Sequence, residues 1–186
     1  ESDIHVENQK AAGLPTRDAA KTFIYAFLYG AGDAKVGEVI GKGRAAGRTI
    51  KETFLKALPA LAKLKACISN TLSDRDFLKG LDGRRLFIRS EHAALNTLLQ
   101  SAGAVIMKQA TVELSRSLTE IGLSRGSDWE FVAHVHDEFQ MEVRPQHAET
   151  VKSASVTAIR DAGRILGFRC PLDGEARAGA NWAETH

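Results

Sequence analysis

The chain has 186 residues, of which 44% are hydrophobic and 26% are charged, a balance typical of a globular protein with a buried core. No apolar run approaches the roughly 18 residues that a membrane span requires, and no signal peptide opens the chain. The two cysteines, Cys67 and Cys170, lie far apart, which excludes a disulfide scaffold and a zinc finger and is typical of a protein from a reducing cytoplasm.

The net charge of +2 is unevenly distributed along the chain. Residues 1–110 carry +6, from 17 Lys and Arg against 11 Asp and Glu, and residues 111–186 carry −4, from 8 against 12. A basic half joined to an acidic half indicates an anionic ligand on one side and cations or a metal ion on the other. Chance clustering on solvated helix faces is the alternative explanation.

The first 75 residues are dominated by helical patterns. Residues 1–15 predict an irregular segment with a weak helical stretch. Thr16 is a good helix N-cap, and a helix is predicted from Arg17 to about Tyr29, ended by the Gly30–Gly32 segment. Further helices are expected at about 33–42, 44–57 and 60–72.

From residue 76 onward the pattern changes. Residues 77–79 and 86–89 flank Leu81-Asp82-Gly83, which predicts a β-hairpin. A long helix is expected at 92–121, a second hairpin from runs at 129–135 and 139–143, a helix at 145–166 and a short strand at 168–170. We therefore predict an α+β fold, with a mostly helical part (1–91) followed by a part with a small antiparallel sheet and packed helices (92–186).

The first candidate site lies on the helix that follows Pro15. Its members are spaced by four residues: Arg17, Lys21, Tyr25 and Tyr29. Each step of four advances about 400° around a helix, so these side chains form one gently spiralling ridge. Cations near exposed N-terminal amides suit an oligophosphate, and the phenols beyond them suit its sugar or base. The alternative is a solvated Arg/Lys face with ordinary core tyrosines.

The second candidate is a polar ladder on an Ala/Leu-rich helix, formed by His92, Asn96 and Gln100. Asn and Gln amides can donate to the N3 and O2 acceptors that every base pair presents in the DNA minor groove. Such a ladder would check pair geometry without reading sequence. A polar stripe that faces water is the alternative.

The third candidate is the turn of the second hairpin. We expect Asp137 and Glu138 to occupy a tight turn with His136 beside them, and one strand face to carry Trp129, Phe131, Ala133 and Val135. Adjacent carboxylates on a hairpin offer hard oxygen ligands for Mg²⁺, as two-metal phosphoryl transfer needs. Asp and Glu are also common turn residues.

In this order and at this spacing, the segments resemble the family A DNA polymerases. Residues 17–30, RDAAKTFIYAFLYG, are similar to the family's motif B, R-x-x-x-K-x-x-x-[FY]-x-x-x-Y-G, and residues 135–138, VHDE, to its motif C. Residues 80–84, 89–103 and 181–186 are most similar to replicases of short-tailed bacteriophages. The resemblance implies fingers over about 1–91, the second half of a palm over about 92–186, and addition of dNTPs to a primer 3′ end with two Mg²⁺ ions.

The resemblance assigns the incoming nucleotide to one group of residues. Arg17, Lys21 and His5 would bind the triphosphate, with Lys21 counted among the catalytic residues. Tyr25 would lie beside the deoxyribose with its hydroxyl in the 3′ region, which implies tolerance of chain-terminating nucleotides.

A second group would bind DNA and metal. The implied DNA-binding residues are Tyr29 and Gly30 at the template, His136 at the primer end, and His92, Asn96 and Gln100 in the minor groove. Asp137 would ligand the catalytic Mg²⁺ ions, and Glu138 would support the site.

One part of the family pattern is missing from these residues. Motif A, D-x-S-x-x-E-x-R, supplies the other metal-binding aspartate and would precede His5, as would the thumb and any exonuclease. Since the chain also begins with Glu1 rather than Met, we expect it to be a piece of a longer protein. We expect it to be inactive alone, to need the upstream part of the same polymerase, and to associate with copies of itself through an exposed palm edge.

Other interpretations remain open. The chain could be a non-catalytic DNA- or nucleotide-binding prophage remnant or one half of a split polymerase, although intact motif B and motif C residues argue against decay. A third hypothesis is an unrelated helical protein in which His134 and His136, on one strand face, bind a transition metal together with Asp137. The resemblance places a phage- or prophage-encoded protein in the cytoplasm of a bacterial host.

Overall fold

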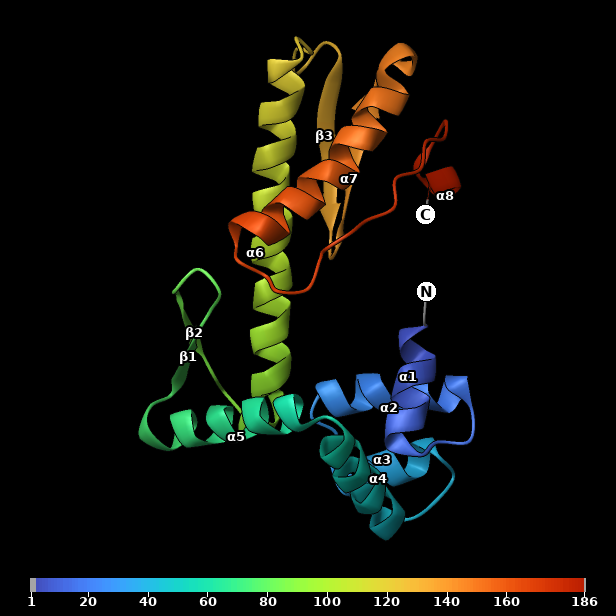
Figure 1. Ribbon diagram of the computed structural model, residues 1–186, viewed down its shortest axis with the longest axis vertical. Coiled ribbons are helices and arrows are strands. Elements are labelled where there is room, and N and C mark those ends of the chain that lie inside the picture. Colours follow the sequence, from blue (N-terminus) through green and yellow to red (C-terminus); the bar gives the residue numbers. More distant parts are fainter. Residues whose placement is uncertain (1–2, 186) are drawn as a thin grey trace. The chain divides into compact units, whose positions relative to one another are not determined.

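The computed structural model describes residues 3–185, which form two compact units that divide between Leu99 and Gln100. The division falls within one long helix, α6 (Glu91–Glu120), so α6 contributes residues to both units (Figure 1). The mixture of helices with small antiparallel sheets is the α+β fold predicted from the sequence. None of the helices in residues 3–185 is long and apolar enough to cross a bilayer. The assignment of residues 1–91 to fingers and 92–186 to palm stays a prediction.

The first unit consists of five helices and a hairpin that precede α6. They are α1 (Ile4–Ala12), α2 (Arg17–Leu28), α3 (Asp33–Val39), α4 (Arg44–Ala57), α5 (Pro59–Asp74), β1 (Phe77–Lys79) and β2 (Arg85–Phe87). Helix α2 begins where predicted, because the Thr16 side chain accepts a hydrogen bond from the Ala19 amide at 3.2 Å. Asp3 caps α1 in the same way through the His5 amide at 2.7 Å, so the entry segment is a regular helix rather than irregular chain.

Three phenylalanines form the centre of the first core. Phe23 and Phe27 of α2 meet Phe54 of α4, with ring centroids 5.1–5.8 Å apart. All three side chains are at most 2% exposed. Burial of an aromatic side chain of this size contributes about 1.5–3 kcal/mol. This cluster therefore fixes which face of α2 turns inward.

The β1–β2 hairpin has the turn predicted for Leu81-Asp82-Gly83. Strand pairing runs from Phe77 opposite Phe87 to Lys79 opposite Arg85, so β2 begins one residue before the expected start. Gly83 has a φ of 83°, the left-handed conformation that glycine adopts without steric cost.

The second unit contains the C-terminal part of α6 and the elements that follow it. These are β3 (Trp129–Val135), β4 (Glu138–Val143), the 3₁₀ turn η1 (Pro145–His147), α7 (Ala148–Ile165) and α8 (Trp182–Thr185). The hairpin and α7 lie beside this part of α6 (Figure 1). Its core is formed by Leu114, Leu118, Trp129, Val151 and Ala158.

Two predictions for this unit need correction. The helix expected at 145–166 opens with the 3₁₀ turn at Pro145, and its α-helical part begins at Ala148. Residues 168–170 form no strand. The Phe168 amide instead donates to the Gly163 carbonyl at 3.0 Å, and Gly167 has a φ of 72°, which is how a left-handed residue closes a helix end. The Phe168 amide is therefore used to cap α7 and is not available to a sheet.

Candidate functional site

The ridge predicted on α2 faces solvent along its whole length. Arg17 and Lys21 are exposed, and the side chains of Tyr25 and Tyr29 are 52% and 62% exposed. The opposite face of the helix is held by the buried phenylalanines described above. The alternative of ordinary core tyrosines is therefore wrong, since both phenols are available to a ligand.

Arg17, at the start of this ridge, is paired with a residue that the sequence did not point to. Its Nε donates to Oδ2 of Asp3 at 2.7 Å, while Oδ1 of Asp3 caps α1. The Arg17 hydrogen bond and then the His5 amide hold the pKa of the Asp3 carboxyl below its ordinary value. Asp3 thus joins the segment that carries His5 to the first cation of the ridge.

Lys21 and His5, the other two candidates for phosphate binding, make fewer polar contacts than Arg17. Lys21 forms no ion pair with any residue in 3–185. His5 is half-buried, and its buried Nδ1 has no hydrogen-bond partner among these residues. The exposed ammonium of Lys21 is therefore available to a ligand, whereas the Nδ1 atom of His5 is buried from solvent.

The end of the ridge meets the start of the polar ladder. Gly30 has a φ of 78°, and a Cβ atom built on it would lie 2.0 Å from the backbone oxygen of His92. Two candidates from separate motifs, 62 positions apart in the sequence, are thus in backbone contact. Only glycine permits this approach at such a dihedral angle.

The ladder lies on α6 as expected. His92 and Gln100 are exposed and Asn96 is half-buried, whereas the neighbouring Ala94 and Leu95 turn into the core. A spacing of four on one continuous helix places the three polar side chains along one face. Their contact with a minor groove stays a prediction.

The turn between β3 and β4 differs from the expected one by one residue. His136 and Asp137 alone form it, and Glu138 is the first residue of β4, paired with Val135. His136 has a φ of 53° and is the one residue other than glycine in 3–185 with a positive φ. A two-residue hairpin turn demands positive φ in its first central residue, and here a histidine takes that position.

A β-bulge changes the faces of β3. Phe131 pairs with Met141 but Ala133 pairs with Gln140, so Val132 is an extra residue. Beyond it the alternation reverses, and the His134 ring packs against Phe139 at 6.0 Å between centroids. The prediction that Trp129, Phe131, Ala133 and Val135 share one face is therefore wrong beyond Phe131.

The bulge and turn also bear on the transition-metal hypothesis. His134 is exposed on β3, with its ring 5.4 Å from that of Phe131 and 6.0 Å from that of Phe139, while His136 lies in the turn itself. They do not share a strand face, so that prediction was wrong. Within residues 3–185 no three His, Cys, Asp or Glu side chains come close enough to hold a metal ion.

Asp137 and Glu138 nevertheless fit part of a magnesium ligand set. Asp137 is exposed at the tip of the hairpin, and Glu138 is half-buried beside it. Mg²⁺ is commonly held by one or two carboxylates, with water and phosphate oxygens completing its shell. The donor chemistry suits Mg²⁺, and the remaining ligands would come from outside this pair.

Two contacts near Glu138 were missed from the sequence. The Nε2 of Gln140 donates to Oε1 of Glu138 at 3.2 Å, and Oε1 of Gln140 accepts from the Thr185 hydroxyl at 3.3 Å. The i, i+2 spacing of Glu138 and Gln140 was the only available signal, and a strand makes such neighbours share a face. Nothing local in the sequence indicates Thr185.

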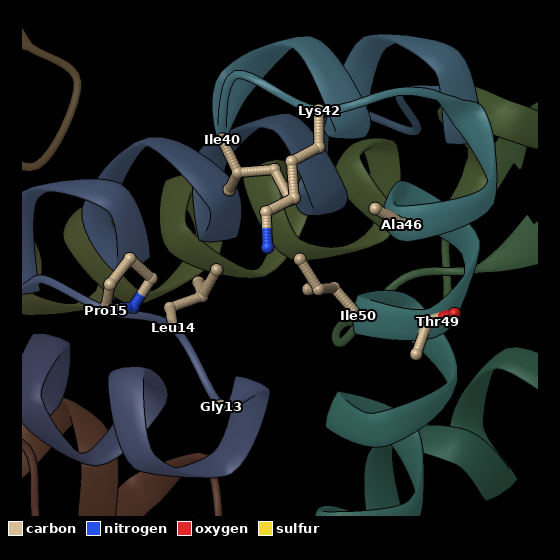
Figure 2. A pocket seen from close by; sticks show the side chains of 8 residues that line it. All are labelled: Gly13, Leu14, Pro15, Ile40, Lys42, Ala46, Thr49 and Ile50. Carbon is tan, nitrogen blue, oxygen red and sulfur yellow. The ribbon is translucent and has the colours of Figure 1, made fainter.

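A pocket in the first unit is separate from all of these residues. Figure 2 shows its lining residues on the Gly13–Pro15 connection, the end of α3 and helix α4. The volume of the pocket is about 320 Å³. Its walls are largely apolar, and Lys42 provides the one charged side chain in the lining. The candidate site is thus an exposed surface, not this pocket.

Comparison with known proteins agrees with the motifs. The model of the family described as DNA polymerase family A matches residues 2–184. The chain is 47% identical to the DNA-directed DNA polymerases of Enterobacteria phage T3 and Escherichia phage T7, over 99% of this chain and 29% of each relative. It is 40% identical to that of Escherichia phage Phieco32, over 100% of this chain and 31% of the relative. The chain therefore spans less than a third of these curated relatives.

A solved structure shows the same fold. It is the POL domain of Pol1 from M. smegmatis in complex with DNA primer-template and dNTP, with a TM-score of 0.76 over 94% of this chain and 32% of that one. The sequence identity is 19%, so this likeness concerns the fold alone. With motif B displayed on α2, motif C on the β3–β4 hairpin and a family match over nearly every residue, the chain belongs to DNA polymerase family A.

Proposed function

We propose that this chain supplies the fingers and the second half of the palm of a DNA-directed DNA polymerase, which adds dNTPs to a primer 3′ end during DNA replication. The observation that carries the proposal is the solvent-facing ridge of Arg17, Lys21, Tyr25 and Tyr29 on α2. A motif B sequence whose tyrosines were buried could not bind a nucleotide, whereas this one presents every motif side chain to solvent.

The ridge is suited to a nucleoside triphosphate. Arg17 and Lys21 lie in the first turns of α2, where the exposed amides add positive potential, and His5 is on the segment tied to Arg17 by Asp3. These groups would stabilise the negative charge that develops on the leaving pyrophosphate. Tyr25 would contact the deoxyribose. The Asp3 carboxylate accepts a hydrogen bond from Arg17, so a triphosphate that binds Arg17 would take the place of this carboxylate.

The DNA-binding role rests on two further surfaces. Tyr29 and Gly30 would lie at the templating base, and the ladder of His92, Asn96 and Gln100 would contact the minor groove of the newest base pairs. The +6 charge of residues 1–110 favours association with a polyanion.

The β3–β4 hairpin would provide the metal-binding carboxylates. Asp137, exposed at the turn, would hold Mg²⁺, with Glu138 supporting it and His136 at the primer end. Bound Mg²⁺ ions would lower the pKa of the primer 3′-hydroxyl and neutralise phosphate charge. The protein's own part would be to hold the two carboxylates next to each other, Asp137 in the hairpin turn and Glu138 at the start of β4.

The activity would need more than these residues. The chain spans 29% of the phage T7 relative, and we propose that its upstream complement supplies the remaining palm carboxylate and the thumb, with both parts acting in the cytoplasm of a bacterial host. In residues 3–185 the β3–β4 sheet has only two strands, and Val132 at its bulge is 60% exposed. Such an edge favours self-association, which would appear as dimers or larger species in light scattering.

Primer extension tests the proposal. The 186-residue chain would be assayed alone and as a chimera in which it replaces the matching segment of the phage T7 relative. We expect the chimera to extend a primer with Mg²⁺ and four dNTPs, and the isolated chain to bind primer-template DNA without extending it.

Two substitutions in the chimera make the test specific. Asp137→Ala should lower the extension rate by at least about 100-fold, in the range seen when an electrostatic group of an active site is removed. Glu142→Ala is the matched control, since Glu142 is exposed on the same hairpin and stands opposite Glu130. Equal rates for the Asp137→Ala chimera and its parent would contradict the proposal. A chimera that binds DNA but never extends it would instead favour a non-catalytic binding module.

A further inference from the structure

The side chain of Gln140 connects motif C to α8, the single C-terminal helical turn of Trp182–Thr185. It is half-buried on β4, two residues after Glu138 and on the same strand face. Its amide nitrogen donates to Glu138 Oε1 at 3.2 Å, and its amide oxygen accepts from Thr185 Oγ1 at 3.3 Å. Both ends of one amide are thus used, across a separation of 45 residues.

The turn that carries Thr185 is itself held in place by short-range contacts. The Glu184 carboxylate accepts hydrogen bonds from the Asn181 side chain at 2.8 Å and from the Ala180 backbone amide at 2.9 Å. Thr185 also contacts the Trp182 carbonyl at 3.0 Å, so its single hydroxyl proton is shared between that carbonyl and Gln140. The Thr185 hydroxyl is therefore held by a contact within α8 as well as by its contact with Gln140.

Hydrogen-bonding chemistry determines which way the Gln140 amide points. An ionised Glu138 carboxylate can only accept, so the amide must present its NH₂ group to Glu138 and its oxygen to Thr185. A Thr185 hydroxyl proton directed at that oxygen favours the same orientation. The opposite rotamer would place two oxygens against each other beside Glu138.

We propose that Gln140 is a positioning residue for the Glu138 carboxylate and that Thr185 holds Gln140 in its productive orientation. The C-terminal turn would thereby set the geometry of the second motif C carboxylate. The inference rests on the proposed polymerase function, in which Glu138 supports the metal site, and its first test is independent of activity.

That first test uses NMR spectra of the 186-residue chain. The side-chain amide signals of Gln140, assigned by their loss in Gln140→Leu, should shift in Glu138→Gln and in Thr185→Val. They should not shift in Glu149→Gln, which alters an exposed carboxylate on α7 that pairs with Lys152. If the Gln140 signals stay unshifted in both Glu138→Gln and Thr185→Val, the proposed contacts of Gln140 with Glu138 and Thr185 are wrong.

The second test uses the chimera and asks whether Gln140 acts through Glu138. Gln140→Leu should lower kcat by roughly tenfold, the worth of one hydrogen bond to a charged group, with little change in KM for dNTP. Thr185→Val should give a smaller loss, and Thr185→Ser, which keeps the hydroxyl, should recover it.

Double substitutions separate positioning from a merely structural role. In a Glu138→Ala background, Gln140→Leu should have no further effect on kcat, because the group it positions is gone. The same tenfold loss in both backgrounds would overturn the proposal. A parent chimera that cannot extend primers would instead overturn the proposed polymerase function. The positioning role of Gln140 would then fall as well, even if the NMR shifts confirm its hydrogen bonds.

Discussion

The backbone oxygen of His92 lies where a side chain at Gly30 would begin: a Cβ atom on Gly30 would stand 2.0 Å from it. This contact joins the last residue of motif B to the first residue of the polar ladder on α6. The turn after α2 and the start of α6 are consequently fixed to each other through backbone atoms. A proposed template-contacting residue and a proposed minor-groove residue thus lie in backbone contact.

Gly30→Ala should destabilise the chain by more than about 2 kcal/mol, from about 1–2 kcal/mol of left-handed strain plus the overlap with His92. Gly13→Ala is the matched control, because Gly13 has a φ of 64° but no atom within 4 Å of its Cβ position. We expect Gly13→Ala to show the strain alone, as a smaller shift of the urea midpoint. Equal shifts for the two variants would show that the His92 contact is not rigid.

Tyr25→Phe should leave stability nearly unchanged and alter nucleotide selection. Tyr25 is 52% exposed, and its hydroxyl makes no hydrogen bond to any residue within 3–185, so its removal breaks no such contact. If its hydroxyl occupies the 3′ region of the incoming nucleotide, its removal should raise discrimination against dideoxynucleotides in the chimera, measured as the ratio of kcat/KM for dNTP and ddNTP. Phe27→Leu, a substitution on the buried face of the same helix, should instead lower stability and leave this ratio unchanged.

The Asp3–Arg17 pair predicts a pH-dependent contribution to stability. Arg17 holds the pKa of Asp3 below its ordinary value of 3.8, so the stabilisation is fully present above that value and is lost as the pH falls through the lowered one. Asp3→Asn keeps a capping side chain but removes the charge. Thermal unfolding should therefore separate the parent from Asp3→Asn at pH 7, and the difference should shrink as the pH is lowered below 3.8.

A variant that lacks the Arg17 guanidinium provides the control for the Asp3–Arg17 pair. When Arg17→Met is already present, the stability change caused by Asp3→Asn should lose most of its dependence on pH, because the leading cause of the lowered pKa is gone. A pH dependence that survives in this background would assign the effect to the cap of α1 alone.

His136 should respond to substitution according to backbone conformation. With a φ of 53°, it tolerates glycine, and His136→Gly should stay within about 0.5 kcal/mol of the parent. His136→Val should cost about 1–2 kcal/mol, since a β-branched residue is disfavoured at positive φ. Urea unfolding measures both, and similar stabilities for the two variants would contradict a left-handed turn residue. Both should weaken primer binding in the chimera, measured as a higher Kd for primer-template DNA.

The sequence by itself determined the local elements and the family. Helix α2 was predictable because the Thr16 cap and the four-residue spacing of its ridge act within one helix. The β3 strand and the Leu81-Asp82-Gly83 turn were predictable for the same reason, since their signals lie within a few residues. Motifs B and C in order, with the spacing between them, were sufficient to indicate family A.

Only the tertiary structure decided how these elements use their side chains. The bulge at Val132 moves His134 to the aromatic face, and strand pairing places Glu138 in β4 rather than in the turn. Asp3 meets Arg17 across 14 positions, and Thr185 meets Gln140 across 45. Such contacts depend on how separate segments pack and on which polar groups find partners there, and a local pattern carries no record of either.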